Sequence, residues 1–264
     1  MADDDLLWQH VRALPAFRAL LRAVEARFYQ TLLPLEGPVL DVGCGDGHFA
    51  SVALPEPLAA GIDPAAASLK EAGARGAYGV LARAMGDALP FADAYFATAI
   101  SNSVLEHIPA VEPVLAEVAR VLRPGGRFIF CVPGERFADL LFFSRLLSRL
   151  GLKSLARAYR RYFNRISRHR HDDGPDVWRR RLAASGLEPG DHFYYFSRRA
   201  TYALDLGHYL GAPSLVAKKL TGRWIVVPSR WNLALTERLL RPLYEEPLPG
   251  EGEGAYLFFI AHKP

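Results

Sequence analysis

Cysteine is scarce in this 264-residue chain, which holds only Cys44 and Cys131 and no CxxC pair. That usage excludes a disulfide framework and a cysteine-rich zinc cluster. No apolar run approaches the roughly 18 residues that span a bilayer, and the acidic start, Met1 to Asp5, lacks the basic and apolar regions of a secretory signal. With half of its residues apolar, the chain is expected to be a globular protein. Because neither a signal nor a membrane span is visible in the sequence, a cytoplasmic location is expected.

The charge is unevenly distributed along the chain. Residues 1–133 hold 10 Lys and Arg against 15 Asp and Glu, a net charge of −5, whereas residues 134–264 hold 22 against 13, a net charge of +9. An acidic, glycine-punctuated first half followed by a basic, aromatic-rich second half indicates that one part holds a cofactor and the other meets a partner or substrate.

Hydrophobic periodicity predicts an α/β fold. Between residues 7 and 32 apolar residues recur at helical spacings, interrupted at Pro15, and after Gly37 short apolar runs alternate with helical stretches, as in βαβ units. The expected strands are 39–42, 59–62, 80–84, 95–100, 127–132, 192–196 and 255–261. Segments 136–170 and 198–249 are too long for simple connections, so helical insertions are expected there.

These elements suggest a single composite domain in four parts. The parts are an N-terminal helical cover (1–36), a cofactor-binding core (37–133), a basic amphipathic helical insertion (134–190), and the sixth and seventh strands with a second helical insertion (191–264).

A glycine-rich turn follows the first strand directly, in the sequence VLDVGCGDG at 39–47. Glycine lacks a Cβ and accepts positive φ, so a ligand can lie close to the main chain and its N–H groups at the start of the next helix. A dinucleotide fingerprint requires a small residue three positions after Gly45, where this chain has His48. The spacing therefore favours a nucleoside with an uncharged tail, against the alternative of a plain tight turn.

Two carboxylates follow the next two strands. Asp63, in GIDP, is placed to accept both hydroxyls of a ribose, and Asp87, in GDALPF, can accept from an exocyclic adenine amine. Taken singly, each is as consistent with a helix N-cap. Together with the glycine turn, they favour a nucleoside site at the carboxyl edge of a parallel sheet.

The motifs VLDVGCGDG, GIDP, GDALPF, SNSVLEHI and LRPGGRF, in this order, resemble those of class I S-adenosylmethionine-dependent methyltransferases, in particular the type 11 group. The resemblance covers about residues 37–133. It implies a Rossmann-like seven-stranded sheet of order 3-2-1-4-5-7-6 with the last strand antiparallel, helices on both faces, and S-adenosylmethionine as cofactor. By motif position, it assigns Asp41, Gly43, Cys44, Gly45 and Gly47 to the methionine and ribose, Asp63 to the ribose, Pro64, Asp87 and Ala88 to the adenine, and Ser101 and Asn102 to the sulfonium side.

Histidines are the candidate catalytic residues, because a hydroxyl or protonated amine acceptor benefits from a general base. His107 directly follows the fourth strand on the cofactor side, and His169 and His171 resemble a histidine-containing stretch of many type 11 enzymes. The structural alternatives are a histidine at a helix start and a solvated loop. No metal is expected, because the sequence shows no third ligand near the last two histidines. Glu106 is given no function, since adjacent helical residues do not face each other.

The first insertion is the main substrate feature. Apolar residues between 137 and 150 form a helical stripe, while basic residues recur every fourth position from 145 to 165 with no acid between 145 and 170. Residues 137–170 can lie on an anionic membrane surface, admit a lipid-like substrate, or contact nucleic-acid phosphates. The alternative is a helical hairpin packed on the core, with a break at Gly151.

Aromatic and basic residues also interleave between 194 and 231, where they can stack bases or line an apolar pocket. RNA-recognition patterns are absent, and the fourth strand ends in SNSV (101–104) rather than the Asn/Asp-Pro-Pro-Tyr type of loop that base-modifying methyltransferases share. The first hypothesis is therefore methyl transfer to a bulky, partly apolar small molecule or lipid-like acceptor. RNA methylation and a non-catalytic adaptor are the alternatives.

Overall fold

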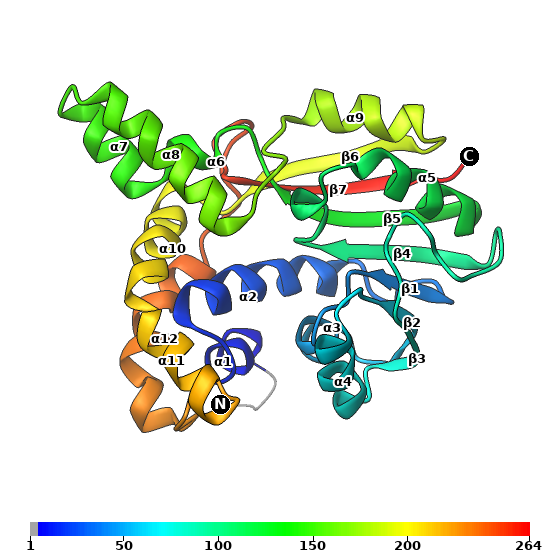
Figure 1. Cartoon of the computed structure of the whole chain (residues 1–264), viewed down its shortest axis with the longest axis horizontal. Helices are drawn as coiled ribbons and strands as arrows, with labels where there is room; N and C mark the ends of the chain where they lie inside the picture. Colours follow the sequence, from blue (N-terminus) through cyan, green and yellow to red (C-terminus); the bar gives the residue numbers. More distant parts are fainter. Residues whose placement is uncertain (1–4) are drawn as a thin grey trace.

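The computed structural model describes residues 5–264, so the first four residues of the acidic start lie outside it. Its centre is one seven-stranded sheet of order β3-β2-β1-β4-β5-β7-β6 (Figure 1). The strands are β1 (Val39–Val42), β2 (Leu58–Ile62), β3 (Tyr78–Ala82), β4 (Phe96–Asn102), β5 (Leu122–Pro133), β6 (Glu188–Tyr195) and β7 (Tyr256–His262). Strands β1 to β5 are parallel to one another, and β7 pairs antiparallel with both β5 and β6. The predicted order and the antiparallel last strand are confirmed.

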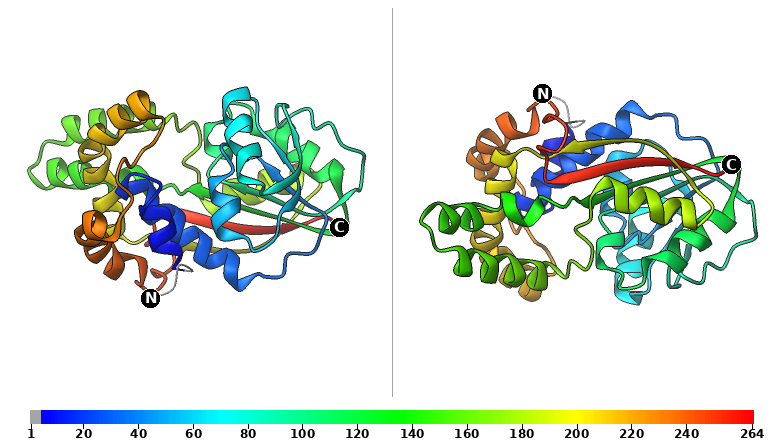
Figure 2. Two further views of the ribbon diagram at one scale, coloured as in Figure 1. Left: turned by 90° about the horizontal axis from the view of Figure 1, so that it is seen from below. Right: turned by 90° about the horizontal axis from the view of Figure 1, so that it is seen from above.

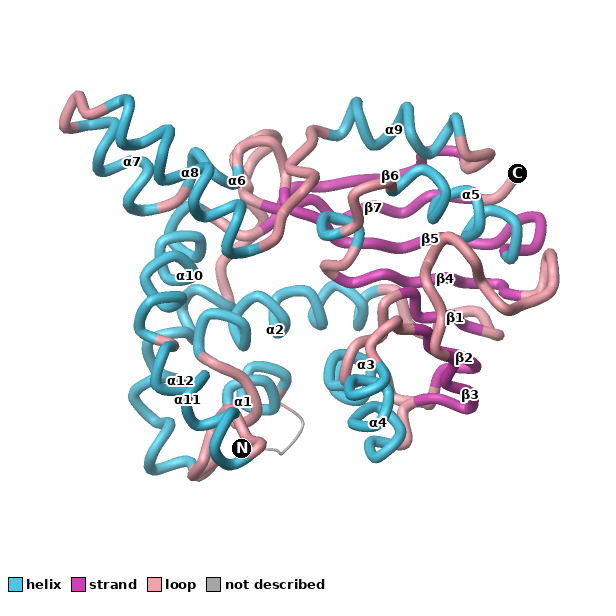
Figure 3. The backbone as a smooth tube through the Cα atoms, in the orientation of Figure 1, coloured by secondary structure: helices cyan, strands magenta, loops and turns pink. Residues whose placement is uncertain are grey.

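Helices cover both faces of this sheet (Figure 3). One face packs against α2 (Ala16–Thr31) and α3 (His48–Ala53), and α4 (Ala66–Arg75) follows beside β3. The opposite face packs against α5 (Val111–Val121) and α9 (Pro175–Ala184). Strand residues alternate between the two cores, as a pleated sheet requires; Phe128 and Phe130 face α9, whereas Ile129 faces α2.

The strand boundaries differ from the predicted ones where the sequence is polar. β5 starts five residues earlier than expected, because Leu122 already pairs with Phe96 ahead of a register shift. β6 also starts earlier, at Glu188, opposite His262 of β7. Hydrogen-bond pairing with a neighbouring strand, rather than local hydrophobicity, sets these ends.

The N-terminal segment forms α1 (Leu6–Val11) and α2, and the break between them falls at Pro15 as predicted. α2 carries a fully buried carboxylate, Glu25. Arg22 donates to it over 2.6 Å, and the hydroxyl of Tyr195 on β6 donates over 2.8 Å. Asn102 and Ser103, at the end of β4, donate over 2.6 and 3.0 Å. One side chain thus joins the N-terminal helix to two strands.

The two predicted insertions are helical. After β5 come α6 (Phe137–Leu140), α7 (Phe142–Arg149) and α8 (Lys153–Ser167), and after β6 come α10 (Arg198–Leu210), α11 (Ala212–Thr221) and α12 (Arg230–Tyr244). Gly151, at φ +77°, turns the chain between α7 and α8, which form the expected hairpin. Figures 1 and 2 show this hairpin at one end of the molecule, beside α10. Within residues 5–264, no helix has both the length and the apolar character to cross a bilayer.

The Glu25→Ala substitution tests the weight of the buried network. It leaves Arg22 and three polar side chains without their common acceptor, so we expect the free energy of unfolding to fall by about 3–5 kcal/mol in urea titrations. Glu36→Ala is the control, because Glu36 makes an exposed ion pair with Arg123 and its loss should cost at most about 1 kcal/mol. Equal losses in the two variants would contradict a structural function of Glu25.

Candidate active site

A cavity of about 400 Å³ lies at the carboxyl ends of β1 and β4, a size typical of small-molecule sites (roughly 300–1,000 Å³). Its lining comes from α1–α2, the glycine loop, α3, α4, the end of β4 and the second insertion. The lining residues are Leu14, Arg18, Arg22, Asp41, Gly43, Cys44, Gly45, Asp46, His48, Phe49, Ser68, Glu71, Asn102, Ser103, Val104, His107, Lys218 and Trp224. A larger cavity, at residues 33–39 and 54–59, lies at the amino ends of the strands, away from this edge.

The glycine loop forms the floor of the cavity, and its glycines serve different purposes. A Cβ on Gly45, whose φ is +55°, would meet no protein atom within 4 Å, so this residue presents bare main chain to open space. A Cβ on Gly43 would instead lie 2.5 Å from Val104, so that glycine permits close packing of the loop on the end of β4. Gly45 is therefore the position where a ligand can approach the backbone.

The amide groups of this loop already have partners, which corrects one expectation. The N–H groups of Gly43 and Cys44 donate to the carbonyl of Ile62. The N–H of Gly47 donates to Cys44, that of His48 to Asp46, and that of Gly45 to the Asp63 carboxylate over 3.1 Å. The sequence had suggested that these N–H groups face a ligand, but each is bonded within the protein. A loop without these free donors does not suit a pyrophosphate, which helix N-terminal amides bind.

Asp41 is the buried acidic group of the cavity, with 4% of its surface exposed. Burial raises the pKa of Asp41 to about 7, although the Tyr78 hydroxyl, which donates to it over 2.7 Å, and the charge of Arg22 oppose this shift. An acidic residue held in this way is expensive for the fold and is typical of a ligand site.

The predicted cofactor residues divide into two groups. Asp41, Gly43, Cys44, Gly45 and Asn102 line the cavity. Those outside the lining are Gly47, Asp63, Pro64, Asp87, Ala88 and Ser101. Asp63 remains beside the floor, since its oxygens accept from Gly45 and Ala65, whereas Ser101 is buried and donates to the Val42 carbonyl.

Several lining residues were not found from the sequence. Lys218, from α11, forms an ion pair with Glu71 of α4 at 3.2 Å, and the Arg18 guanidinium lies 5.5 Å from the centre of the Trp224 ring. The second insertion therefore contributes part of the cavity wall. Its only sequence signal was the interleaving of aromatic and basic residues, which does not indicate where the segment folds back.

Near the end of β4 the cavity is polar. Asn102 donates to Glu25, but its Oδ1 is buried and has no hydrogen-bond partner among the described residues. His107, on the 3₁₀ turn η1 (Leu105–His107), also lines the cavity. Burial, together with the positive charges of Arg22 and Arg168, lowers the pKa of His107 despite its contact with the Arg168 carbonyl, so the imidazole is neutral at pH 7.

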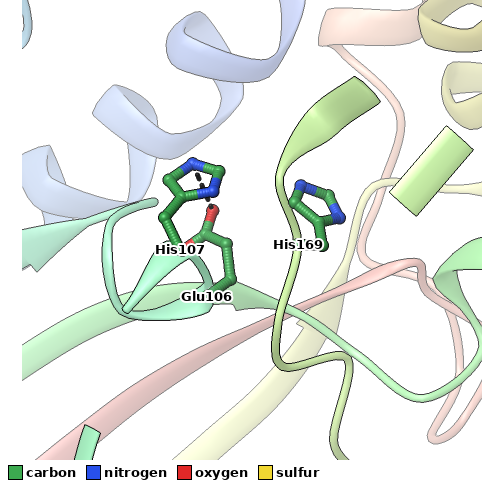
Figure 4. Close-up of side chains that lie close together, drawn as sticks. All are labelled: Glu106, His107 and His169. Atoms are coloured by element: carbon green, nitrogen blue, oxygen red, sulfur yellow. Dashed lines mark ion pairs between the residues drawn. The ribbon is translucent and has the colours of Figure 1, made fainter. Parts of the chain in front are cut away.

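The other predicted histidines take different places. His169 lies beside His107, with ring centroids 5.6 Å apart. His171 instead faces the Ile108 carbonyl at 2.9 Å and Asp173 at 3.4 Å. The expectation that Glu106 cannot face His107 is wrong: their side chains approach to 3.8 Å because they leave a single 3₁₀ turn, where the imidazole lies over the carboxylate (Figure 4).

The Asp41→Asn substitution tests the cost of the buried carboxyl. A free Asp has a pKa near 3.9, so Asp41 of the unfolded wild type ionises as the pH rises from about 4 to 7. In the folded protein Asp41 stays protonated over this range, and the folded state therefore loses stability relative to the unfolded state. Asparagine cannot ionise but can still accept from Tyr78. We therefore expect urea titrations at pH 4.5, 6 and 7.5 to show Asp41→Asn gaining stability over wild type as the pH increases.

The control for this experiment is Asp93→Asn, because the Asp93 side chain is 78% exposed beside Arg120. A stability difference between Asp41→Asn and wild type that stays constant with pH would contradict the raised pKa.

Comparisons with known proteins agree with this geometry. Residues 40–130 match the family model described as a methyltransferase domain. An uncharacterized methyltransferase of Mycobacterium marinum is 41% identical over 91 residues, which are 33% of this chain and 36% of that protein. One of Mycobacterium tuberculosis is 33% identical over 141 residues, covering 46% of this chain and 55% of that protein. The chain thus aligns with about a third to a half of the length of these relatives.

Among solved structures, a Thermotoga maritima methyltransferase, described as a possible histamine N-methyltransferase, superposes with a TM-score of 0.57. The identity is 18%, over 94% of this chain and 91% of that one, so the shared feature is the fold. The domain match, the strand order and the glycine loop lead to one conclusion. This chain contains a class I S-adenosylmethionine-dependent methyltransferase domain of Rossmann-like fold.

Proposed function

We propose that this protein transfers a methyl group from S-adenosylmethionine to a bulky, partly apolar acceptor, small or lipid-like. The observation that carries the proposal is the cavity at the sheet edge, which is open above Gly45 and lined by Asp41 and Asn102. When bound, the cofactor supplies an already activated methyl group. The protein therefore has to bind the cofactor and the acceptor, orient them, and exclude water.

The residues of the cavity fit such a cofactor. Acidic groups at Asp41 and Asp46 suit a positively charged sulfonium and the amino group of its tail. Arg18 lines the cavity, and among residues 5–264 no carboxylate pairs with it, so it can hold the tail's carboxylate. We assign Asp63 to the ribose, and we retain Pro64, Asp87 and Ala88 as predictions for the adenine and Ser101 as a prediction for the sulfonium side.

The acceptor is proposed to enter near His107, which lines the cavity by the end of β4. Its Nδ1–H points at the Arg168 carbonyl at 3.3 Å, which leaves Nε2 with a free lone pair. That nitrogen can take a proton from an acceptor or bind a cation. A catalytic function of His169 and His171 stays a prediction.

The Gly45→Leu substitution tests the cofactor site. The added side chain would enter the cavity, so calorimetry should show at least tenfold weaker binding of S-adenosylmethionine than in wild type. Gly76→Leu is the matched control: Gly76 also has positive φ and open space, but it caps α4 and does not line the cavity. Folded wild type that binds no cofactor would instead favour the non-catalytic adaptor.

The α7–α8 hairpin supports the lipid-like acceptor. One of its basic residues, Arg160, forms an ion pair with Asp139. Six others have no carboxylate within 4.0 Å in the described part of the chain: Arg145, Arg149, Lys153, Arg157, Arg161 and Arg165. Around the turn, Leu146, Leu150, Leu152 and Leu155 are 40–64% exposed. Exposed leucines beside unpaired arginines match an anionic lipid surface. α8 ends one residue before Arg168, whose carbonyl contacts His107, so we propose that the hairpin rests on a membrane and leads acceptors to the cavity.

The double substitution Leu150→Glu with Leu155→Glu tests this contact. We expect it to reduce binding to phosphatidylglycerol vesicles at least tenfold in co-sedimentation, because two apolar anchors are lost and two negative charges are added. The control is Leu235→Glu, since Leu235 is 69% exposed on α12, outside the hairpin. Wild type that binds RNA with a steep salt dependence but no vesicles would favour the RNA alternative. The cytoplasmic location stays a prediction.

A further inference from the structure

We propose that Glu106, His107 and His169 bind a first-row divalent transition-metal ion. One ligand atom from each of these residues lies within 4.8 Å of the other two. Metal binding stands on this geometry alone, whereas its place at the acceptor end rests on the proposed function. The sequence argument against a metal was the lack of a third ligand near His169, and folding supplies two.

Two separate segments form the cluster. Glu106 and His107 lie on η1 after β4, and His169 follows α8 in the first insertion (Figure 4). Main-chain hydrogen bonds hold the segments together, because the N–H groups of Arg170 and His171 donate to the Glu106 carbonyl over 2.7 and 3.3 Å. The ligands therefore come from a fixed junction, so that rotation of side chains suffices to bring them around an ion.

The side chains are oriented as metal ligands require. A metal-binding histidine usually donates its second ring N–H to a carbonyl or carboxylate, which leaves the other nitrogen free for the ion. His107 has this arrangement: its Nδ1 lies 3.3 Å from the Arg168 carbonyl, and its Nε2 is 3.8 Å from Glu106 Oε1. His169 lies beside His107, with ring centroids 5.6 Å apart, and its Nδ1 has no hydrogen-bond partner among the described residues, so each imidazole has a nitrogen available for an ion.

Two buried polar atoms of the cluster, Glu106 Oε2 and His169 Nδ1, have no hydrogen-bond partner in the described part of the chain. Glu106 is only 2% exposed. The neighbouring cation, Arg22, is bound to Glu25 instead. A dication between the three side chains would satisfy the orphaned atoms and the buried carboxylate together.

The donor set selects the class of metal. Two imidazoles and one carboxylate suit Zn²⁺, Co²⁺ or Fe²⁺, whereas Mg²⁺ and Ca²⁺ prefer oxygen ligands alone. Three protein ligands leave at least one coordination position open. Because His107 also lines the cavity, that position is suited to hold a heteroatom of the acceptor near the end of β4.

The full-length protein, stripped with EDTA and dialysed, is titrated with Zn²⁺ in competition with a chromophoric chelator, and with Co²⁺ while visible absorption is recorded. We expect one ion per chain, a Co²⁺ ligand-field spectrum, and no displacement by millimolar Mg²⁺. The variants Glu106→Gln, His107→Ala and His169→Ala should each weaken Zn²⁺ binding at least tenfold. His192→Ala is the matched control, because this surface histidine lies on β6 and outside the cluster.

These measurements distinguish a failure of the proposed metal site from a failure of the proposed function. If folded wild type binds no Zn²⁺, or if the three ligand variants bind it as tightly as wild type and His192→Ala do, the metal site is wrong. Calorimetry of S-adenosylmethionine on the same variants reports on the cofactor cavity independently. Retained cofactor binding in His169→Ala together with lost Zn²⁺ binding is the expected result, and it also shows that the variant is folded.

Discussion

The site depends on one buried carboxylate in the N-terminal helix. Glu25 accepts hydrogen bonds from Arg22, Asn102, Ser103 and Tyr195, which belong to α2, the end of β4 and β6. A buried charge is tolerated only when it is paired and fully hydrogen-bonded. All four donors must therefore be in place together, and three of them, Arg22, Asn102 and Ser103, line the cavity. The hydrogen bonds that join α2 to the sheet therefore also hold part of the cavity wall in place.

This dependence explains what the sequence could predict. The alternation of strands and helices, the glycine turn, the break at Pro15 and the hairpin at Gly151 follow from local patterns of apolar residues, glycine and proline. The strand order was instead implied by the resemblance of the motifs to a known family. Local patterns extend over a few residues and depend little on the rest of the chain. Glu25 has no such pattern, because in the sequence it is one polar position in an amphipathic helix. Apart from Arg22, its partners lie 77 to 170 residues away, and only the fold brings them together.

The same limit applies to the second insertion and to the histidines. Lys218 and Trp224 reach the cavity because α11 folds back beside α4, which no local spacing indicates. The HRH stretch presented His169 and His171 as joint candidates, but the chain after α8 is irregular there, so sequence spacing does not fix where the two side chains point. One side chain meets Glu106 and His107, while the other turns toward Ile108 and Asp173.

A common junction relates the basic hairpin to the chemistry. The Arg168 carbonyl, which contacts His107, belongs to the residue that directly follows α8, and the next residue is His169. The hairpin and the two imidazoles therefore meet at one point of the chain. The cofactor end is held separately, by the glycine loop bonded to Ile62 and Asp63. The fold thus separates a glycine loop whose N–H groups are largely paired from a cluster in which Glu106 Oε2 and His169 Nδ1 have no partner among the described residues, and it is at this cluster that we propose the acceptor is bound.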